Sequence, residues 1–193
     1  VFVPHTGQVY NIGNAKCEVL SCMDDTIHRT VDVNSTSLVI RMEIAGQVIL
    51  WTADASFSDS RFAEKFGTYL KSDILQVPHH GFQSGTYEAE IEAYEFIKPS
   101  VCLLEASEPV AYNIFCTFRK GTQYLMTRLG IDELITGEET RTLNLPYTAP
   151  SYGRKELEIR YRKGRENAGA RTWVFTGLNT SVDEDFTFSV LNM

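Results

Sequence analysis

The chain contains two apolar runs of strand length, Val48-Ile-Leu-Trp-Thr-Ala-Asp54 and Ile74-Leu-Gln-Val-Pro-His-His-Gly81, and each ends in side chains that can bind metal. Short apolar runs that break into Asp or His at a turn are typical of buried strands with functional residues at their carboxyl ends. A helix-like segment lies between them, over residues 60–71. A strand–helix–strand crossover makes its strands parallel, so both carboxyl ends reach one edge of the sheet, where ligands bind. The sequence therefore predicts that Asp54 lies beside His79 and His80.

Size and composition indicate an ordinary globular domain, with room for one small appendage. The chain has 193 residues, of which 43% are hydrophobic and 22% charged, and its net charge is −7. This acidic balance disfavours broad electrostatic binding to nucleic acid or anionic lipid. It is compatible with a polyanionic substrate held by a bound metal ion, because a local site can oppose the global charge. No run of 18 apolar residues occurs in the sequence, so we expect no membrane segment.

The four cysteines, Cys17, Cys22, Cys102 and Cys116, show no CxxC spacing and have apolar neighbours. This pattern is more typical of buried thiols than of disulfide bridges or metal ligands. Reduced thiols fit a reducing compartment, so a cytoplasmic location is favoured.

Hydrophobic patterning and turn residues predict an alternation of strands and helices in the first three quarters of the chain. A β-hairpin is expected around the short turn Ala45-Gly46. The first 14 residues are expected to be irregular, and residues 23–35 to form a loop. The predicted helices span residues 59–69, 86–97 and 112–129. Ser58 or Asp59 is expected to cap the start of the first helix, and Gly130 the end of the last. The predicted strands span residues 17–22, 37–44, 47–52, 74–77, 100–105, 133–136 and 140–145.

From residue 149 onward the character of the sequence changes. Glycine and proline recur, basic residues cluster over 154–165, and apolar residues alternate in Leu157-Glu-Ile-Arg-Tyr161. We predict a domain over residues 1–148 and a β-rich extension over residues 149–193. The basic residues could form a nucleic-acid arm, but glutamates are interleaved with them, which favours a solvated strand face.

Each of the candidate site residues also has a structural explanation. Asp54 could cap the turn that follows its strand, which is a common role for Asp. His79 and His80 could be one core ring and one exposed ring, and His5 and His28 are expected at the surface. Against this, imidazole and carboxylate together suit a zinc or iron centre, and Gly81 allows the sharp turn that would aim a ring at the metal.

The order and spacing of three segments resemble a known family. These segments are Asn34-Ser-Thr-Ser-Leu-Val-Ile-Arg, Ile49-Leu-Trp-Thr-Ala-Asp54 and Ser72-Asp-Ile-Leu-Gln-Val-Pro-His-His-Gly81. They resemble the carboxyl half of the metallo-β-lactamase fold, in the subgroup that includes the hydrolase-like domain of the DNA-uptake protein ComEC and phosphorylcholine esterase. The resemblance covers residues 34–85 by motif, and residues 7–147 by layout. It implies an α/β protein, half of an αββα sandwich with a mixed sheet and flanking helices, carrying the β-rich extension.

The resemblance also implies chemistry. Asp54 matches the carboxylate that bridges two metal ions in the family, and His79 and His80 match its His-His pair. One of these histidines is expected to bind metal and the other a substrate phosphate; we favour His80 as the ligand. The implied activity is zinc-dependent hydrolysis, most readily of phosphoesters, with Asp54 and His79 as catalytic residues and one or two zinc ions as cofactor.

Three departures from the family pattern bear on this expectation. The motif His-x-His-x-Asp-His of the family's first half is absent, Thr-Gly-Asp is replaced by Thr52-Ala-Asp54, and the late His is missing from residues 107–118. A catalytic zinc site uses three protein ligands and one open position. Either an amino-terminal half supplies the other ligands, or the chain is a metal-free binding or scaffold module that retains the fold. Half a sandwich leaves apolar surface uncovered, so we expect a homodimer or pairing with that half.

Overall fold

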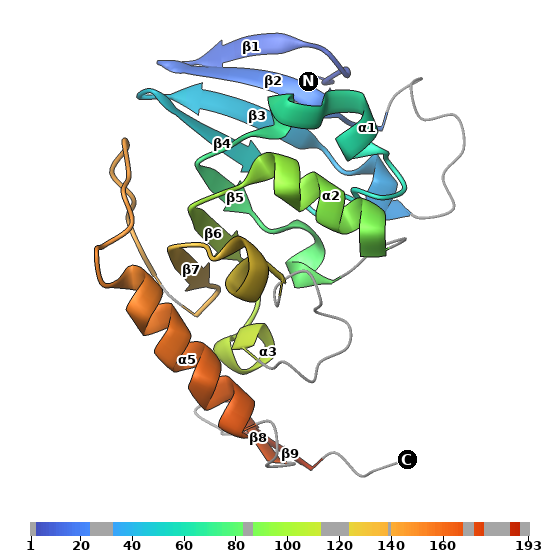
Figure 1. Cartoon of the computed structure of the whole chain (residues 1–193). Helices are drawn as coiled ribbons and strands as arrows, with labels where there is room; N and C mark the ends of the chain where they lie inside the picture. Colours follow the sequence, from blue (N-terminus) through green and yellow to red (C-terminus); the bar gives the residue numbers. More distant parts are fainter. Residues whose placement is uncertain are drawn as a thin grey trace.

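The apolar runs form one mixed sheet of seven strands, whose order in space follows their order along the chain (Figure 1). The computed structural model describes residues 3–23, 33–82, 87–112, 124–138, 140–167, 172–175 and 186–189. The protein is therefore an α/β protein, as predicted. The strands of the sheet are β1 (Val9–Ile12), β2 (Ala15–Ser21), β3 (Val39–Ile44), β4 (Gln47–Trp51), β5 (Ile74–Gln76), β6 (Val101–Leu104) and β7 (Glu133–Thr136).

The sheet has an antiparallel half and a parallel half. Strands β1 to β4 pair antiparallel, and the predicted hairpin turns at Ala45 and Gly46, both with positive φ (51° and 78°), which is typical of a two-residue hairpin loop. Strands β4 to β7 pair parallel, as the crossover argument requires. The carboxyl ends of four neighbouring strands therefore lie at one edge of the sheet.

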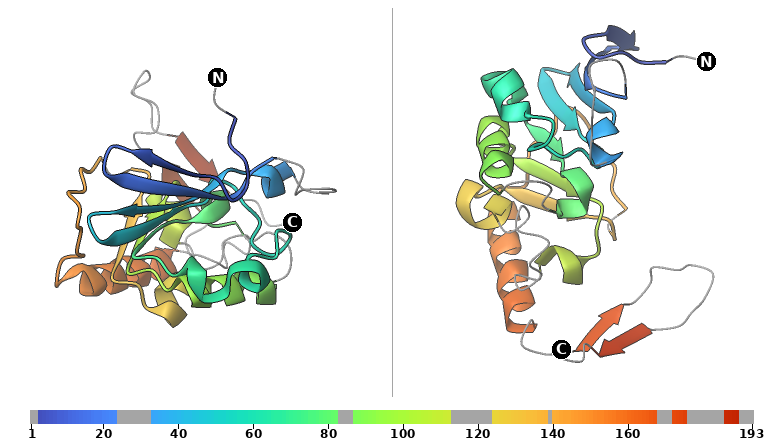
Figure 2. Two further views of the ribbon diagram at one scale, coloured as in Figure 1. Left: turned by 90° about the horizontal axis from the view of Figure 1, so that it is seen from above. Right: turned by 90° about the vertical axis from the view of Figure 1, so that its right-hand side faces the viewer.

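Helices cover one face of the sheet (Figure 2). Successive residues of the parallel strands point to opposite faces, so Leu50, Leu75, Cys102 and Leu134 pack into the core beneath the helices. Both faces are apolar, which explains why these strands are continuous apolar runs. The helices and helical turns are η1 (Val33–Thr36), α1 (Phe62–Phe66), η2 (Gly67–Leu70), η3 (Pro78–Gly81), α2 (Tyr87–Ile97), α3 (Glu108–Tyr112), the π-helical turn η5 (Leu125–Leu129) and α5 (Gly153–Asn167).

An extended segment lies against the opposite face. Ile49, Ile74, Val101 and Ile135 form a second apolar cluster there, and Leu143, Leu145 and Tyr147 pack on it. The predicted strand at residues 140–145 is wrong, because these residues pack on the face of the sheet without joining its hydrogen-bonded ladder. Their alternation reflects contact with a flat apolar surface rather than strand pairing.

Two helix boundaries also differ from prediction. Neither Ser58 nor Asp59 caps α1, which follows Arg61 in a left-handed conformation (φ 54°); the Ser56 hydroxyl instead binds Asp59 within the preceding turn. The predicted helix over 112–129 is represented by α3 and η5, and residues 113–123 lie outside the described residues. The capping role of Gly130 is confirmed, with φ 61° after η5.

The first 14 residues, which were expected to be irregular, contain strand β1, and it pairs with β2 around Gly13.

The prediction of a β-rich segment from residue 149 onward is wrong for α5. A strand would place Leu157, Ile159 and Tyr161 on one side, but Leu157 is buried and Ile159 is 42% exposed. Helical spacing brings Gly153, Leu157 and Tyr161 to the core instead, because they lie four residues apart. Two strands do follow, β8 (Thr172–Phe175) and β9 (Phe186–Ser189), and they pair antiparallel.

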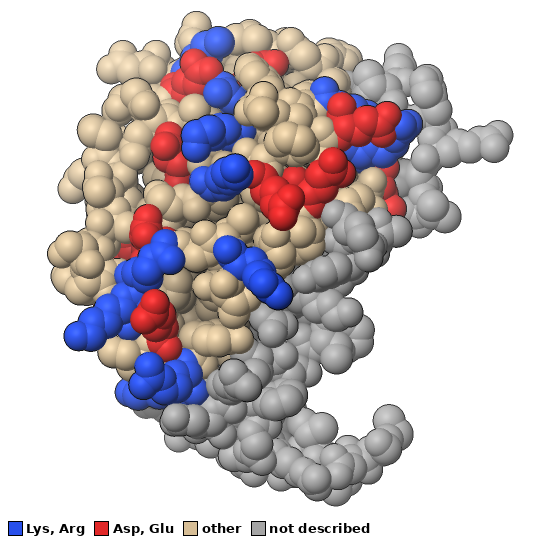
Figure 3. Space-filling view, in the orientation of Figure 1, with Lys and Arg blue, Asp and Glu red and all other residues tan. Residues whose placement is uncertain are grey.

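The cluster of basic residues between positions 154 and 165 therefore lies on a helix rather than on a strand. Arg154 pairs with Asp132, and Arg160 pairs with Glu108 and Glu156, so acidic and basic side chains are interspersed on this surface (Figure 3). Among the described residues, no helix has the length and apolar character needed to cross a membrane.

Candidate functional site

Asp54 and His80 meet at the carboxyl edge of the parallel strands. Asp54 follows the end of β4, and His80 lies in η3, directly after β5. His80 Nε2 is 3.4 Å from Asp54 Oδ1, and the two side chains are 43% and 45% exposed. The predicted proximity of Asp54 to the tandem histidines is therefore confirmed, and the pair is open to solvent and to ligands.

A third strand fixes the orientation of the His80 ring. His80 Nδ1 is 2.9 Å from the backbone oxygen of Glu105, the residue after β6. A carbonyl oxygen can only accept a hydrogen bond, so Nδ1 must carry the proton and donate it. In a neutral ring, the unprotonated Nε2 then directs its lone pair toward the Asp54 carboxylate. With the ring neutral, two acceptor groups face each other, and either a proton on Nε2 or a bound cation would join them.

The backbone of the histidine turn is strained. His79 and His80 have φ values of 49° and 53°, in the left-handed region, and Gly81 continues the turn with φ 80°. Such conformations cost of order 1–3 kcal/mol each in non-glycine residues and concentrate at functional sites. The His79 N–H donates to the Ala53 carbonyl (3.0 Å), so the turn is tied to the chain segment that carries Asp54.

The rings of the two histidines lie in different surroundings. The rings of His79 and His80 have centroids 6.5 Å apart, and the His79 ring packs beside Phe82, with centroids 5.4 Å apart. The ring that faces Asp54 is that of His80. The backbone N–H of His5 binds Gln8 Oε1 at an exposed position, and His28 lies outside the described residues.

The residue before Asp54 is also left-handed. Ala53 has φ 47° and an exposed side chain. The left-handed conformation costs alanine roughly 1–2 kcal/mol, while glycine adopts it freely but loses about 0.5–1 kcal/mol through its greater unfolded-state entropy. We expect Ala53→Gly to leave the free energy of unfolding unchanged or to raise it by up to about 1.5 kcal/mol in urea titrations. A clear loss of stability would contradict the strained conformation.

The loop that follows Asp54 is held beneath α2 by buried groups. Phe57 is 1% exposed, and Glu90 of α2 is also 1% exposed. Burial raises the pKa of Glu90 to about 8; hydrogen bonds with the backbone of Ser58 and Phe57 oppose this rise, and the nearby Asp59 charge adds to it. Glu90 is thus predominantly protonated at neutral pH.

Neither Glu90 nor the buried Gln76 was predicted from the sequence to support the site. A signal for Glu90 existed, because it shares a helical face with the buried residues Ala93, Tyr94 and Ile97. A carboxylate on an apolar helix face is a candidate buried acid.

The described residues do not complete a metal site. Asp54 Oδ1 and His80 Nε2 converge, but no group of three or more His, Cys, Asp or Glu side chains within metal-binding reach occurs in the part of the chain that the structure describes. The donor set matches zinc chemistry in kind, since imidazole and carboxylate are common zinc ligands. It provides two of the three protein ligands that a catalytic site uses.

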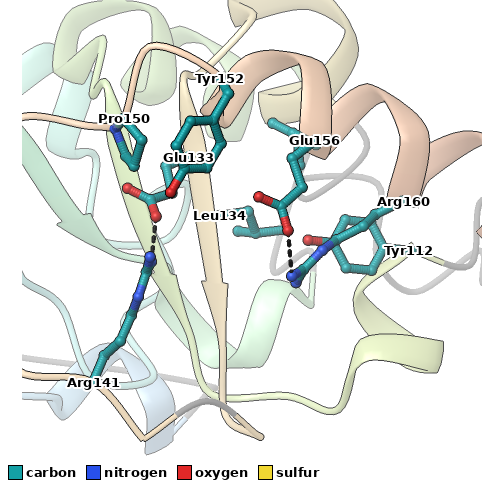
Figure 4. Close-up of a pocket in the computed structure, with 10 residues that line it drawn as sticks. Tyr112, Glu133, Leu134, Arg141, Pro150, Tyr152, Glu156 and Arg160 are labelled. Atoms are coloured by element: carbon teal, nitrogen blue, oxygen red, sulfur yellow. Dashed lines mark hydrogen bonds and ion pairs between the residues drawn. The ribbon is translucent and has the colours of Figure 1, made fainter.

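A hollow of about 40 Å³ lies away from this pair, between β7 and α5 (Figure 4). Its two arginines are already matched with acids, since Arg141 binds Glu133 and Arg160 binds Glu156. With its positive charges neutralised, the hollow lacks the character of an anion site. None of the predicted site residues lines it.

Comparison with known proteins adds no family assignment. No family model matches the chain, and no curated protein matches it. Functional inference therefore depends on the geometry of the site and on the motifs in its sequence.

Proposed function

We propose that the chain carries half of the metal site of a metallo-β-lactamase-like hydrolase, and that Asp54 and His80 are its metal ligands. The observation that carries the proposal is the 3.4 Å separation of His80 Nε2 and Asp54 Oδ1. Two ligand atoms each about 2.0–2.1 Å from a tetrahedral zinc ion are roughly 3.4 Å apart. A direct charge-assisted hydrogen bond between the same atoms would be about 2.7–2.9 Å long.

The environment of His80 supports the same role. Metal-binding histidines commonly donate their second ring N–H to a backbone carbonyl or carboxylate, which fixes the tautomer that leaves the other nitrogen for the metal. The Nδ1 contact with the Glu105 carbonyl has this form. Zinc at such a site would lower the pKa of a bound water and polarise the scissile oxygen of a phosphoester. His79, beside the pair, would contact the substrate phosphate.

Completion of the site requires at least one more protein ligand. The face of the sheet opposite the helices is only partly covered by the segment that carries Leu143, Leu145 and Tyr147. Met42, Ile44, Trp51 and Leu103 are also only partly buried there, so this face offers a surface for the structure that would supply the ligand. In an αββα sandwich this face is covered by a second sheet layer. We propose that such a layer, supplied by a second copy of the chain, covers the rest of this face and completes the metal site.

Zinc titration by calorimetry tests the ligand assignment. We expect Asp54→Ala and His80→Ala each to lower zinc affinity by more than about 100-fold, because the loss of even an outer-shell partner costs 10–100-fold. His79→Ala should retain zinc binding and lose hydrolysis of bis(p-nitrophenyl) phosphate. His5→Ala controls for adventitious binding by a surface imidazole. Unchanged zinc stoichiometry in Asp54→Ala would remove Asp54 from the site.

A metal-free binding or scaffold module is the alternative. It is favoured by the incomplete donor set of the described residues. Under this alternative the wild-type chain binds no zinc and hydrolyses no phosphoester, and Asp54→Ala leaves both readouts unchanged. The same titration therefore separates the two functions.

A further inference from the structure

The backbone pairing between β4 and β5 stops before the site is reached. The two strands pair at Ile49 with Ile74 and at Leu50 with Leu75, and β4 residues beyond Leu50 have no paired β5 residue. This end of the strand pairing precedes the segments that carry Asp54 and His80. It also leaves the backbone groups of Thr52 and Ala53 without ladder partners, which buried peptide groups must find elsewhere.

The side chain of Gln76 supplies these partners. Gln76 is 5% exposed, and its Oε1 accepts hydrogen bonds from the backbone N–H groups of Thr52 (2.8 Å) and Ala53 (2.6 Å). Its Nε2 donates to the carbonyl oxygens of Val77 (2.9 Å) and Ala53 (3.3 Å). The Thr52 hydroxyl in turn donates to the Gln76 carbonyl (2.6 Å). The carboxamide thus acts as an additional peptide unit inserted between the separated strand ends.

The same contacts reach both metal-binding residues through the backbone. Ala53 is bound at its N–H and its carbonyl by Gln76, and it precedes Asp54. The Ala53 carbonyl also accepts the His79 N–H (3.0 Å), in the strained turn that carries His80. A shift of Ala53 would therefore move Asp54 and the histidine turn relative to each other.

We propose that Gln76 is a positioning residue that sets the separation of Asp54 and His80; this inference depends on the proposed metal site. The chemistry requires an amide. Glutamate would keep an acceptor for the two N–H groups but place a second oxygen against the carbonyls of Val77 and Ala53. Methionine would fill similar space and leave two buried N–H groups unpaired.

The chain contains a matched control. Gln47, at the opposite end of β4, forms the same kind of two-point amide contact, donating to the Tyr147 carbonyl (2.6 Å) and accepting from the Tyr147 N–H (2.5 Å). Gln47→Met therefore removes two amide hydrogen bonds at the other end of β4, whereas Gln76→Met removes four at the end that carries the site. The comparison of Gln76→Met with Gln47→Met separates positioning of the site from general loss of structure.

The experiment measures the affinity for zinc alone and the ¹⁵N shifts of the His80 ring in the metal-free protein. Both variants should lose stability, but only Gln76→Met should weaken zinc binding. We expect a loss of at least about tenfold, which is the usual effect of removing a group that orients a metal ligand. Only Gln76→Met should shift the His80 ring signals. Equal effects of the two variants on zinc affinity, or unchanged affinity in Gln76→Met, would overturn the proposal.

Hydrogen exchange in the wild-type protein and the His80 ring shifts of the metal-free variants test the role of Gln76 even if Gln76→Met does not fold or the protein binds no zinc. In the wild-type protein, the Thr52 and Ala53 amides should be protected from hydrogen exchange, and rapid exchange of both would exclude the Gln76 contacts even if Gln76→Met does not fold. If the wild-type protein binds no zinc, the proposed function fails. The His80 ring shifts of the metal-free variants then report separately whether Gln76 positions the turn.

Discussion

Replacement of the buried acid Glu90 by glutamine is expected to make the protein markedly more stable at alkaline pH. The folded-state pKa of Glu90 is raised from 4.5 to about 8 by burial. As the pH rises above 4.5, the unfolded chain loses this proton while the folded protein retains it, so the folded state loses stability at about 1.4 kcal/mol per pH unit. The loss continues to about pH 8, and its upper limit is about 5 kcal/mol.

Glu90→Gln keeps the shape of the protonated acid and removes the titration. Its unfolding free energy, from urea titrations at pH 5 to 9, should therefore exceed that of the wild type by a margin that grows by several kcal/mol over this range. Glu92→Gln is the matched control, because Glu92 is an exposed carboxylate on the same helix. If Glu90→Gln and the wild type show the same pH dependence, Glu90 is not held protonated.

The central part of the fold follows directly from the sequence. The apolar runs at β4, β5 and β6 are too short for helices and are broken by turn residues, so their strand identity and parallel order could be predicted. The position of Asp54 beside the tandem histidines followed from that topology, but the topology did not determine that the His80 ring, rather than the His79 ring, would face it. Prediction succeeded where one local pattern had one structural interpretation.

Prediction failed where one pattern had two interpretations. The alternation at Leu157, Ile159 and Tyr161 fits a strand, but four-residue spacing also fits a helix, and packing of Leu157 against the core decides between them. The alternation of Leu143 and Leu145 arises from packing on the sheet face. Tertiary contacts determine both outcomes, and no window of local sequence contains them.

The polar supports of the site could not be predicted for a related reason. Gln76 occupies one position of an apolar strand, and its role depends on the separation of β4 from β5 beyond Leu50. The Glu105 contact uses a backbone carbonyl, which carries no side-chain signal at all. Ligands can be recognised by residue type, whereas the groups that orient them are recognised by geometry.

Truncation of Phe57 is expected to have the second large effect, and to link core packing to the site. Phe57 lies three residues after Asp54, and its ring contacts Tyr94 edge-on, with centroids 5.7 Å apart, and Phe62 at 5.4 Å. Phe57→Ala should reduce the free energy of unfolding by about 3–5 kcal/mol, as is typical of buried phenylalanines. Phe66→Ala, which truncates a half-buried ring on α1, should cost clearly less.

The two variants should also differ at the metal site. Phe57 anchors the loop that begins at Asp54, whereas Phe66 lies at the far end of α1. Loss of the Phe57 anchor should therefore weaken zinc binding under conditions in which both variants remain folded, while Phe66→Ala should leave it near the wild-type value. Equal zinc affinities in the two variants would show that the position of Asp54 depends on the strand ends and not on the packing of its loop. In that case the contacts of Gln76 with Thr52 and Ala53 would be sufficient to hold the carboxylate in place.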